Sequence, residues 1–386
     1  MGDDMMPMHS STSPRFSIYC LTAIVLLAGA CHAIAVHKPT GIFSSSGASN
    51  SNIYQNPELR GVLIRTSWSK IEPRPGEFDF SHLDAQVAKA REQEVQWALA
   101  VAGGATASPA WIIDTLEADY LEISFRGKSG YRLPLYWDPV AQARLALLAH
   151  ELAERYQDDE QLALVYVTQM TSNGIEGHLN GVDMSAMRQV GYTDDKWVNA
   201  SIKAARSFAE AFENKAVAIE LHELNHSAAV PTRIMNELWA DPSLEERVGV
   251  GLWWLSGKTH YQAGLIDALA AFPGDIYAQV IGRSDQARRF EAGDYKRVFD
   301  QAKQLDIRYI EAWEYEFRSS GRSAQGAWNA AFEDFNHWAD AHYREEPSNA
   351  IAPCCVPSSK LSTKKSDQPS TAELITDKIA RAQVEN

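Results

Sequence analysis

The stretch GVLIRTSWSKIEPRPGEFDFSHLDAQVAKAREQEVQWALAVAGG, residues 61–104, decides the fold of this chain. Residues 61–66 and 95–102 are short and mostly apolar runs, as strands buried on both faces are. Between them, residues 81–93 open with a serine suited to capping a helix and place Leu83, Val87 and Ala90 on one face. A strand, a helix and a second strand in this order predict two parallel strands joined by a right-handed crossover.

The same alternation continues along most of the chain. Further strands are predicted at residues 41–46, 162–169, 216–221, 248–254, 276–282 and 306–313. Further helices are predicted at residues 140–156, 196–212, 261–272, 295–305 and 325–343, whereas residues 47–60 hold only a weak helical pattern. Strands that alternate with helices in this way predict an α/β fold of the (β/α)₈ TIM-barrel type, formed by a single domain over residues 37–345. No G-x-G-x-x-G follows the first strand, which argues against a dinucleotide-binding sheet.

The two ends of the chain differ from this pattern. Residues 1–36 resemble a secretory signal peptide, because Arg15 precedes an apolar run at residues 21–28 and small residues follow that run. The segment Leu27-Ala-Gly-Ala-Cys31 is also similar to a bacterial lipobox, so the sequence leaves open either simple cleavage or a lipid anchor at Cys31. The expected location is therefore secreted or periplasmic. Residues 346–386 are rich in Pro, Ser, Thr and Lys and are predicted to form a disordered tail.

Composition limits the classes of partner and of stabilisation. The 386 residues carry a formal net charge of -14, which disfavours binding to a nucleic acid or to an anionic membrane surface. Of the four cysteines, only Cys354 and Cys355 lie outside the leader, and neighbouring cysteines rarely bridge each other. The fold therefore depends on its core and not on disulfides. No pattern predicts a cofactor or the oligomeric state.

Functional side chains of a (β/α)₈ barrel lie where the carboxyl ends of the strands meet the following loops. The carboxylates predicted there are Glu176 after the fourth strand, Glu220 on the fifth and Glu311 on the eighth. Further candidates at these ends, for binding a substrate, are Arg65, Trp68, Asn173, His178, His222, Trp253, Trp254, Arg283, Asp285 and Trp313. The tryptophans suit stacking on sugar rings, and packing in the core explains them equally well. The two arginines suit either a substrate carboxylate or a buried glutamate.

Several of these stretches resemble the clan A glycoside hydrolases, notably their β-galactosidase-like members. RTSWSKIEPRPGEFDFSHLD (residues 65–84) looks like the second-strand signature of that group, and GGATASPAW (residues 103–111) is similar to the segment after its third strand. The resemblance spans roughly residues 41–317 and implies hydrolysis of a glycosidic bond in a carbohydrate substrate. It also implies that Glu176 is the acid/base, with Asn173 three residues before it instead of adjacent.

The seventh strand departs from the family pattern, because residues 276–285 contain no Glu where the family keeps its nucleophile. Glycoside hydrolysis needs two carboxyl groups, one to donate a proton and one to act as nucleophile or base. We expect Glu311 to take the second role, since a Glu at the end of an apolar strand is costly unless it is partnered or used. Glu220 and Asp285 are the alternatives, and a structural ion pair explains each glutamate about as well. The missing Glu also leaves open a non-catalytic carbohydrate-binding barrel.

One motif favours a different reaction class. His222-Glu-Leu-Asn-His226 matches the H-E-x-x-H motif of zinc proteases, in which two His on one helical face bind zinc and the Glu acts as general base. Three features argue against this interpretation: the fifth strand is needed directly before the motif, Pro231 soon limits a helix, and no third-ligand pattern comes after it. We therefore predict no metal site and keep a secreted metalloprotease as the less favoured alternative.

Overall fold

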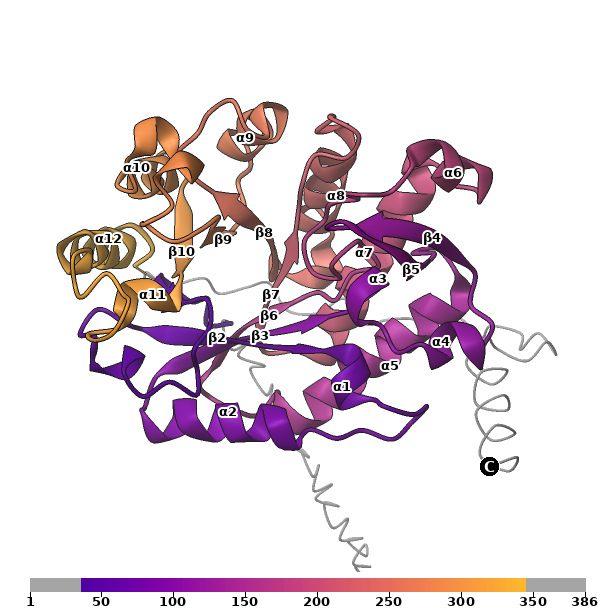
Figure 1. Ribbon diagram of the computed structural model, residues 1–386, viewed down its shortest axis with the longest axis horizontal. Helices are drawn as coiled ribbons and strands as arrows, with labels where there is room; N and C mark the ends of the chain where they lie inside the picture. Colours follow the sequence, from indigo (N-terminus) through magenta and orange to yellow (C-terminus); the bar gives the residue numbers. More distant parts are fainter. Residues whose placement is uncertain (1–35, 345–386) are drawn as a thin grey trace, which may run out of the picture. The chain divides into compact units, whose positions relative to one another are not determined.

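The computed structural model describes residues 36–344. Within this part of the chain, eight parallel strands close into a barrel in the order β1-β10-β9-β8-β7-β6-β3-β2 (Figure 1). These strands are β1 (Gly41–Ser44), β2 (Gly61–Ser67), β3 (Gln96–Ala102), β6 (Leu162–Tyr166), β7 (Ala216–Glu220), β8 (Val248–Leu255), β9 (Ile276–Val280) and β10 (Ile307–Ala312). Each of them falls on a strand predicted from the sequence, so the (β/α)₈ barrel is confirmed.

Two predictions concern residues outside this range. The leader expected over residues 1–36, with Cys31, and the tail expected over residues 346–386 lie outside the described residues, Val36 excepted. Both stay predictions from the sequence. Among residues 36–344, none of the helices combines the length and the apolar character needed to cross a membrane.

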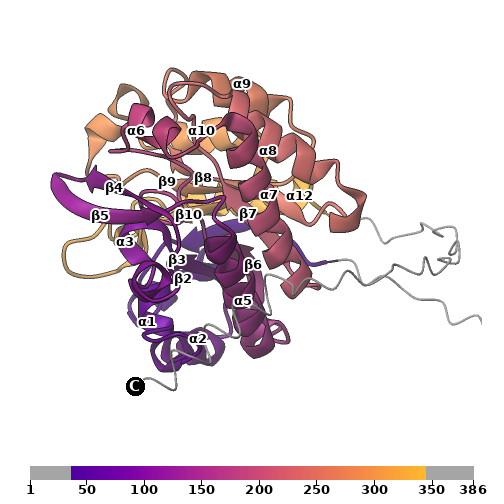
Figure 2. The ribbon, with the colours of Figure 1, turned by 90° about the vertical axis from the view of Figure 1, so that its right-hand side faces the viewer.

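Helices connect the strands and surround the barrel (Figures 1 and 2). The longer ones are α2 (Ser81–Glu92), α5 (Pro139–Tyr156), α7 (Asp194–Ala211), α8 (Ala229–Trp239), α9 (Ala263–Ala270), α10 (Arg297–Gln304) and α12 (Asn329–His342). Local chemistry sets where they begin: the Asp138 carboxylate accepts a hydrogen bond from the Ala141 N–H at 2.9 Å, and Pro139 occupies the first turn of α5. Except for α8, these helices lie where the sequence predicts them.

Helix α8 is an addition to the sequence prediction, which treats Pro231 as the limit of a helix. Pro231 lies in the first turn of α8, which begins at Ala229. The first N–H groups of a helix have no partner within it, so a proline is tolerated there. Pro231 therefore limits a helix that would run into it from the preceding residues, but it is compatible with the first turn of a helix that begins at Ala229.

Two layers of apolar side chains hold the barrel together. The interior contains Phe43, Tyr166, Tyr277 and Tyr309, and the rings of Phe43 and Tyr309 lie 4.4 Å apart between centroids. Gly61 on β2 leaves room for this packing, because a Cβ atom there would collide with the Phe43 ring. A larger apolar core lies between the strands and the helices. The interior is therefore filled, and function belongs to the loops at its end.

Several short elements lie in those loops. They are α1 (Trp68–Ile71), α3 (Gly104–Ala107), α4 (Trp111–Asp114), α6 (Met184–Gln189), α11 (Glu314–Phe317) and the antiparallel hairpin of β4 (Tyr120–Phe125) and β5 (Lys128–Pro134). Single 3₁₀ turns occur at Ile53–Gln55, Pro242–Leu244, Ala287–Arg289 and Glu291–Gly293. The hairpin follows β3 and was not predicted; it lies at the same end of the barrel as α6 (Figures 1 and 2).

Candidate active site

The loop that follows β6 holds the best catalytic candidate in a fixed position. The Gln169 side-chain amide donates to the carbonyl oxygens of Ile175 at 2.5 Å and Glu220 at 2.9 Å. Gly174 has φ 82° and lies so close to the Gly103 backbone that a Cβ atom would not fit. The loop is thus tied to the neighbouring strands on both sides. This anchoring fixes the backbone on which Glu176 stands.

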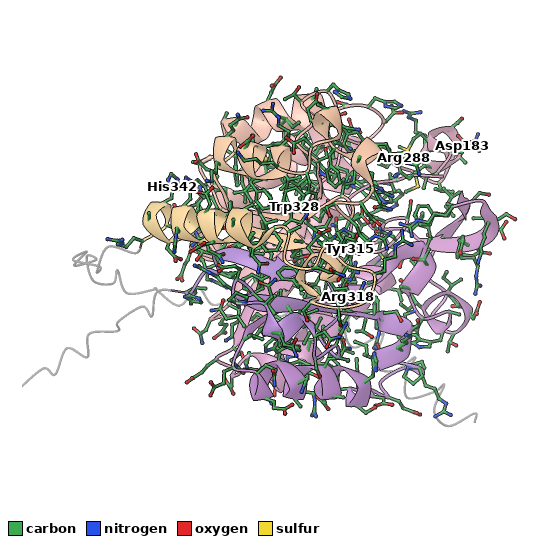
Figure 3. The ribbon with its side chains drawn as sticks, turned by 60° about the vertical axis from the view of Figure 1, so that its left-hand side comes forward. Asp183, Arg288, Tyr315, Arg318, Trp328 and His342 are labelled. Atoms are coloured by element: carbon green, nitrogen blue, oxygen red, sulfur yellow. The ribbon has the colours of Figure 1, made fainter. Side chains whose placement is uncertain are left out.

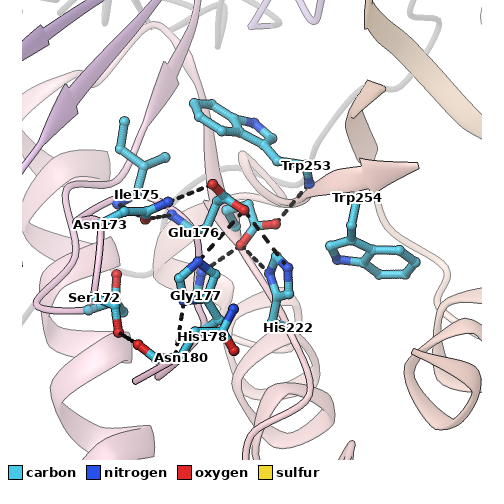
Figure 4. Close-up of polar contacts among 12 residues, drawn as sticks. Ser172, Asn173, Ile175, Glu176, Gly177, His178, Asn180, His222, Trp253 and Trp254 are labelled. Atoms are coloured by element: carbon cyan, nitrogen blue, oxygen red, sulfur yellow. Dashed lines mark hydrogen bonds and ion pairs between the residues drawn. The ribbon is translucent and has the colours of Figure 1, made fainter. Parts of the chain in front are cut away.

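Glu176 presents a partly exposed carboxylate, with 23% of the side chain accessible. Its Oε1 accepts a hydrogen bond from the Asn173 side-chain amide at 2.5 Å, and its Oε2 lies 3.8 Å from His178 Nε2 and 3.9 Å from His222 Nε2 (Figure 4). Burial raises the pKa of Glu176, and the negative charge of Glu220 raises it further. His222, Asn173 and Arg126 oppose this shift. A carboxyl group with a raised pKa can carry a proton near neutral pH, as a general acid must.

Glu220 is fully buried beside this carboxylate and has a partner on each oxygen. Its Oε1 accepts from the Trp253 N–H at 2.8 Å, and its Oε2 accepts from the Gly177 N–H at 2.6 Å and lies 3.0 Å from His222 Nδ1. Burial raises the pKa of Glu220, and the two backbone N–H groups oppose the rise. Both oxygens of Glu220 are thus engaged by neighbouring groups of the site.

The two imidazoles near Glu176 are held in their neutral form. Burial lowers the pKa of His222 to about 4 and that of His178 to about 3. The rings of His178 and His222 meet edge to face, with centroids 5.2 Å apart. Near neutral pH these side chains are uncharged hydrogen-bonding groups around Glu176.

Glu311 lies deeper, on β10, and is also fully buried. Its Oε1 accepts hydrogen bonds from Tyr166 at 2.9 Å and Tyr309 at 2.8 Å, while its Oε2 has no hydrogen-bond partner among the described residues. Burial raises the pKa of Glu311 to about 7, whereas the hydrogen bonds from the two tyrosine hydroxyls and the positive charge of Arg65 act to lower it. The ring of Tyr166 packs on Trp253, with centroids 5.2 Å apart. One layer of side chains therefore separates Glu311 from the surface that Trp253 lines.

Arg65 connects the two carboxylates electrostatically. Its guanidinium lies over the Trp253 ring, 5.5 Å from the centroid. The surrounding protein lowers the pKa of Arg65, whereas the negative charges of Glu311 and Glu176 raise it. A cation placed within reach of both glutamates stabilises their ionised forms.

A cavity of about 370 Å³ opens at this end of the barrel, and we call it the central cleft. Five predicted residues line it: Glu176, His178, His222, Trp253 and Trp254. A neighbouring cavity of about 460 Å³, lined among others by His226, His260 and Gln262, shares His178, His222 and Tyr261 with it. The two cavities therefore adjoin each other at these shared residues.

The remaining predicted residues do not line the central cleft. Trp68 is buried and donates through Nε1 to the Glu72 carboxylate at 2.7 Å. Trp313 donates to the Val280 carbonyl oxygen at 2.8 Å. Arg283 pairs with Asp285 at 3.0 Å and lies over Tyr315 on α11, which is labelled in Figure 3. Arg65, Asn173, Glu220 and Glu311 contact or electrostatically influence the residues that line the cleft.

Other residues of the cleft were missed by sequence reasoning. They are Phe125, Arg126, Asn180, Gly181, Tyr261, Ile281 and Arg289, all from loops or from the end of the hairpin strand β4. The sequence did carry a signal for the hairpin, because an X-Gly pair between two alternating runs is typical of hairpin turns. In the structure the turn residues Arg126 and Gly127 have positive φ angles of 51° and 76°. The other positions carry no local signal.

The H-E-x-x-H segment does not form the zinc-protease geometry. It lies in a turn, with φ 51° at Asn225 and 61° at His226, and a bridge joins Leu224 to Ser227. His222 therefore packs toward Glu220, whereas His226 is exposed. Among residues 36–344, no group of three or more His, Cys, Asp or Glu side chains is placed to hold a metal ion.

A known protein family is similar to the part of the chain that contains the second, third and fourth strands of the barrel. Residues 52–213 match the sequence model of glycoside hydrolase family 42, described as β-galactosidase. This segment contains Arg65, Asn173, Glu176 and His178 and ends before β7, so the match does not reach Glu220 or Glu311. No curated protein sequence matches the chain.

Similar solved structures are distant in sequence and in superposition. The structure of GH10 from Paenibacillus barcinonensis is 13% identical over 71% of this chain and 83% of that one, with a TM-score of 0.46. Xylanase B from Clostridium stercorarium F9 is 16% identical over 72% of this chain and 86% of that one, with a TM-score of 0.44. The fold assignment rests on the strand order and not on these likenesses. The strand order makes this chain a (β/α)₈-barrel protein, and residues 52–213 are similar to the β-galactosidase family model.

Proposed function

We propose that the chain hydrolyses a glycosidic bond with Glu176 as the general acid/base. The observation that carries this proposal is the environment of Glu176: a partly exposed carboxylate in the central cleft, whose pKa burial raises, with neutral His178 and His222 beside it. In the first step Glu176 transfers its proton to the glycosidic oxygen while the bond between that oxygen and the anomeric carbon breaks. The leaving alcohol departs neutral, and Glu176 is left as the carboxylate.

Glu311 is the second carboxylate in this proposal. It either attacks the anomeric carbon through its unpartnered Oε2 or removes a proton from the water that does so. Both roles require the ionised form, which Tyr166, Tyr309 and Arg65 favour against burial. Because Glu311 is fully buried and Tyr166 packs against both Glu311 and Trp253, substrate binding has to displace Tyr166 or Trp253 for contact. Glu220 has no free oxygen and is assigned a positioning role instead.

A second candidate function is a non-catalytic carbohydrate-binding barrel. The observation that favours it is Gln279, which stands on β9 beside Glu311 in the register of the two strands and supplies an amide on the strand where the family carries its nucleophile. An amide cannot act as nucleophile or general base. This alternative keeps the cleft and its tryptophans but assigns no reaction to Glu176.

One experiment separates the candidate functions. The purified chain is incubated with a panel of aryl glycosides and with a peptide substrate, each with and without a chelator. The proposal expects release of the aryl group from at least one glycoside, unchanged by the chelator. Binding of oligosaccharides without any turnover would support the non-catalytic barrel, and chelator-sensitive peptide cleavage would support the metalloprotease.

We also propose that the protein is exported, with the mature chain starting between residues 31 and 36. The support is the order of Arg15, the apolar run at residues 21–28 and the small residues after it. A carbohydrate substrate outside the cell would suit this location. Mass spectrometry of the mature N-terminus tests the proposal: a lipid-modified Cys31 indicates an anchor, an unmodified start in this window indicates free secretion, and an intact leader contradicts export.

A further inference from the structure

The central cleft carries arginines that lack an acidic partner. Arg126 and Arg289 line it, and the exposed Arg65 lies over the ring of Trp253, another lining residue. None of the three takes part in an ion pair within residues 36–344, whereas most arginines in this part of the chain do, for example Arg155 with Asp84 and Arg233 with Asp195. Although the chain carries a net charge of -14, two guanidinium groups that form no ion pair within residues 36–344 line this one cavity.

Arg126 is held above the cleft by the hairpin. It occupies the turn between β4 and β5, and its guanidinium lies over the Phe125 ring, 4.9 Å from the centroid. Phe125 in turn packs against His178, with ring centroids 5.8 Å apart. Arg126 is exposed, yet close enough to Glu176 for its positive charge to lower the pKa of that carboxyl. The hairpin therefore places the positive charge of Arg126 near Glu176, the proposed acid/base.

Arg289 reaches the cleft from the loop after β9. Its Nη1 donates to the Ile281 carbonyl oxygen at 2.8 Å, which leaves the rest of the guanidinium fork available. The side chain runs across Gly282, where a Cβ atom would collide with Arg289 Cδ. Arg289 is exposed apart from these contacts. Two guanidinium groups from different loops therefore face the same cavity as Glu176.

We propose that this cleft binds a glycan with an anionic substituent, a carboxylate or a sulfate, on a sugar adjacent to Glu176, and that Arg126 and Arg289 bind that substituent. The inference rests on the proposed function for its setting, since it names the substrate class of the same site. Guanidinium groups bind planar or tetrahedral oxyanions through paired N–H donors. The overall negative charge of the protein repels an anionic glycan at long range, so local cations are needed to retain it.

The test measures binding without turnover, with the Glu176→Gln variant of the full chain in a titration calorimeter. The probes are tetragalacturonate, a sulfated galactan tetramer and neutral galactotetraose. Adding Arg126→Gln or Arg289→Gln is expected to weaken binding of the anionic probe at least ~10-fold each, a loss typical of a charge-assisted hydrogen bond, and to leave neutral binding unchanged. Arg233→Gln is the control, because Arg233 lies on α8 and pairs with Asp195 outside the cleft.

The outcomes are distinct. Preference for tetragalacturonate over the sulfated tetramer identifies a carboxylate as the substituent, and the reverse identifies a sulfate. The inference is overturned if neither anionic probe binds more tightly than galactotetraose, or if the Arg126 and Arg289 variants bind like the control. Anionic binding without hydrolysis by the unmodified chain would sink the proposed function alone. Hydrolysis of neutral glycosides, with neither anionic probe bound more tightly than galactotetraose, would sink this inference alone.

Discussion

His222 and Glu220 are joined through His222 Nδ1, which lies 3.0 Å from Glu220 Oε2. This contact orients the imidazole so that its other nitrogen, Nε2, faces Glu176 Oε2 at 3.9 Å. Glu220 also accepts from the backbone N–H groups of Gly177, directly after Glu176, and of Trp253. One buried carboxylate therefore positions three parts of the central cleft at once.

Replacing Glu220 by Gln is expected to destabilise the protein by roughly 2–3 kcal/mol and to lower kcat/KM. All oxygens of Glu220 face N–H donors, so the amide NH₂ of Gln would be directed against one of them. Urea unfolding and steady-state kinetics measure the two effects. Glu210→Gln, at an exposed position on α7, is the matched control. Unfolding curves that superimpose for the two variants would contradict the positioning role.

A second prediction concerns the contribution of the Glu72–Arg144 ion pair to the stability of the fold. They form an ion pair in which both side chains are fully buried, and Glu72 also accepts from Trp68 Nε1 and the Gly76 N–H. Glu72→Gln leaves Arg144 charged and without its carboxylate, which typically costs about 3–5 kcal/mol. We therefore expect a large loss in the free energy of unfolding, measured with urea.

The control for this prediction is Glu77→Gln in the same stretch of sequence, where Glu77 pairs with Arg74 at the surface. An exposed pair of this kind contributes little, about 0–1 kcal/mol. Equal effects of the two substitutions would show that the Glu72 pair does not stabilise the fold.

The pH profile of the reaction tests the role of Glu311. Burial raises the pKa of Glu311 to about 7, and a nucleophile or base acts only when ionised. We expect kcat/KM to rise as the pH increases through about 7, where Glu311 ionises. Glu311→Gln should lower kcat/KM at least ~10²-fold.

Tyr309→Phe provides the matched variant. Its hydroxyl donates to Glu311 Oε1 and lowers the pKa of that carboxyl, so removing it should move the acidic limb of the profile to higher pH. Phe keeps the ring that packs on Phe43. An acidic limb that stays in place in Tyr309→Phe, with full activity in Glu311→Gln, would remove Glu311 from the mechanism.

The barrel could be predicted from the sequence because its strands differ clearly in composition from the segments between them. Runs such as residues 216–220 are apolar almost throughout, since they are buried on both faces, and the helices between them have a clear apolar side. The hairpin of β4 and β5 was missed because it lies outside this alternation. Its strands are largely exposed, so they lack the continuous apolar character that marks the barrel strands.

The sequence could predict only those residues of the candidate site that lie at or just after the ends of strands. Glu176, His178, His222, Trp253 and Trp254 lie at or just after the ends of their strands and do line the central cleft. Arg289 and Tyr261 reach the cleft through loop conformations that no local pattern specifies. Hydrogen bonding in the folded chain also distinguishes candidates that look alike in sequence. Glu220 and Glu311 both end apolar strands, yet Glu220 has partners on both oxygens, whereas Oε2 of Glu311 has none among the described residues.

The central claim is that Glu176 donates the proton to the leaving group, and its direct test compares two leaving groups. Kinetics of Glu176→Gln are measured on a 2,4-dinitrophenyl glycoside, which needs no proton, and on the phenyl glycoside of the same sugar, which does. Glu154→Gln, at an exposed position on α5, is the control. We expect the phenyl glycoside to lose at least ~10²-fold in kcat/KM, and the first step on the dinitrophenyl glycoside to change little. Equal rates of variant and control on the phenyl glycoside would contradict the claim.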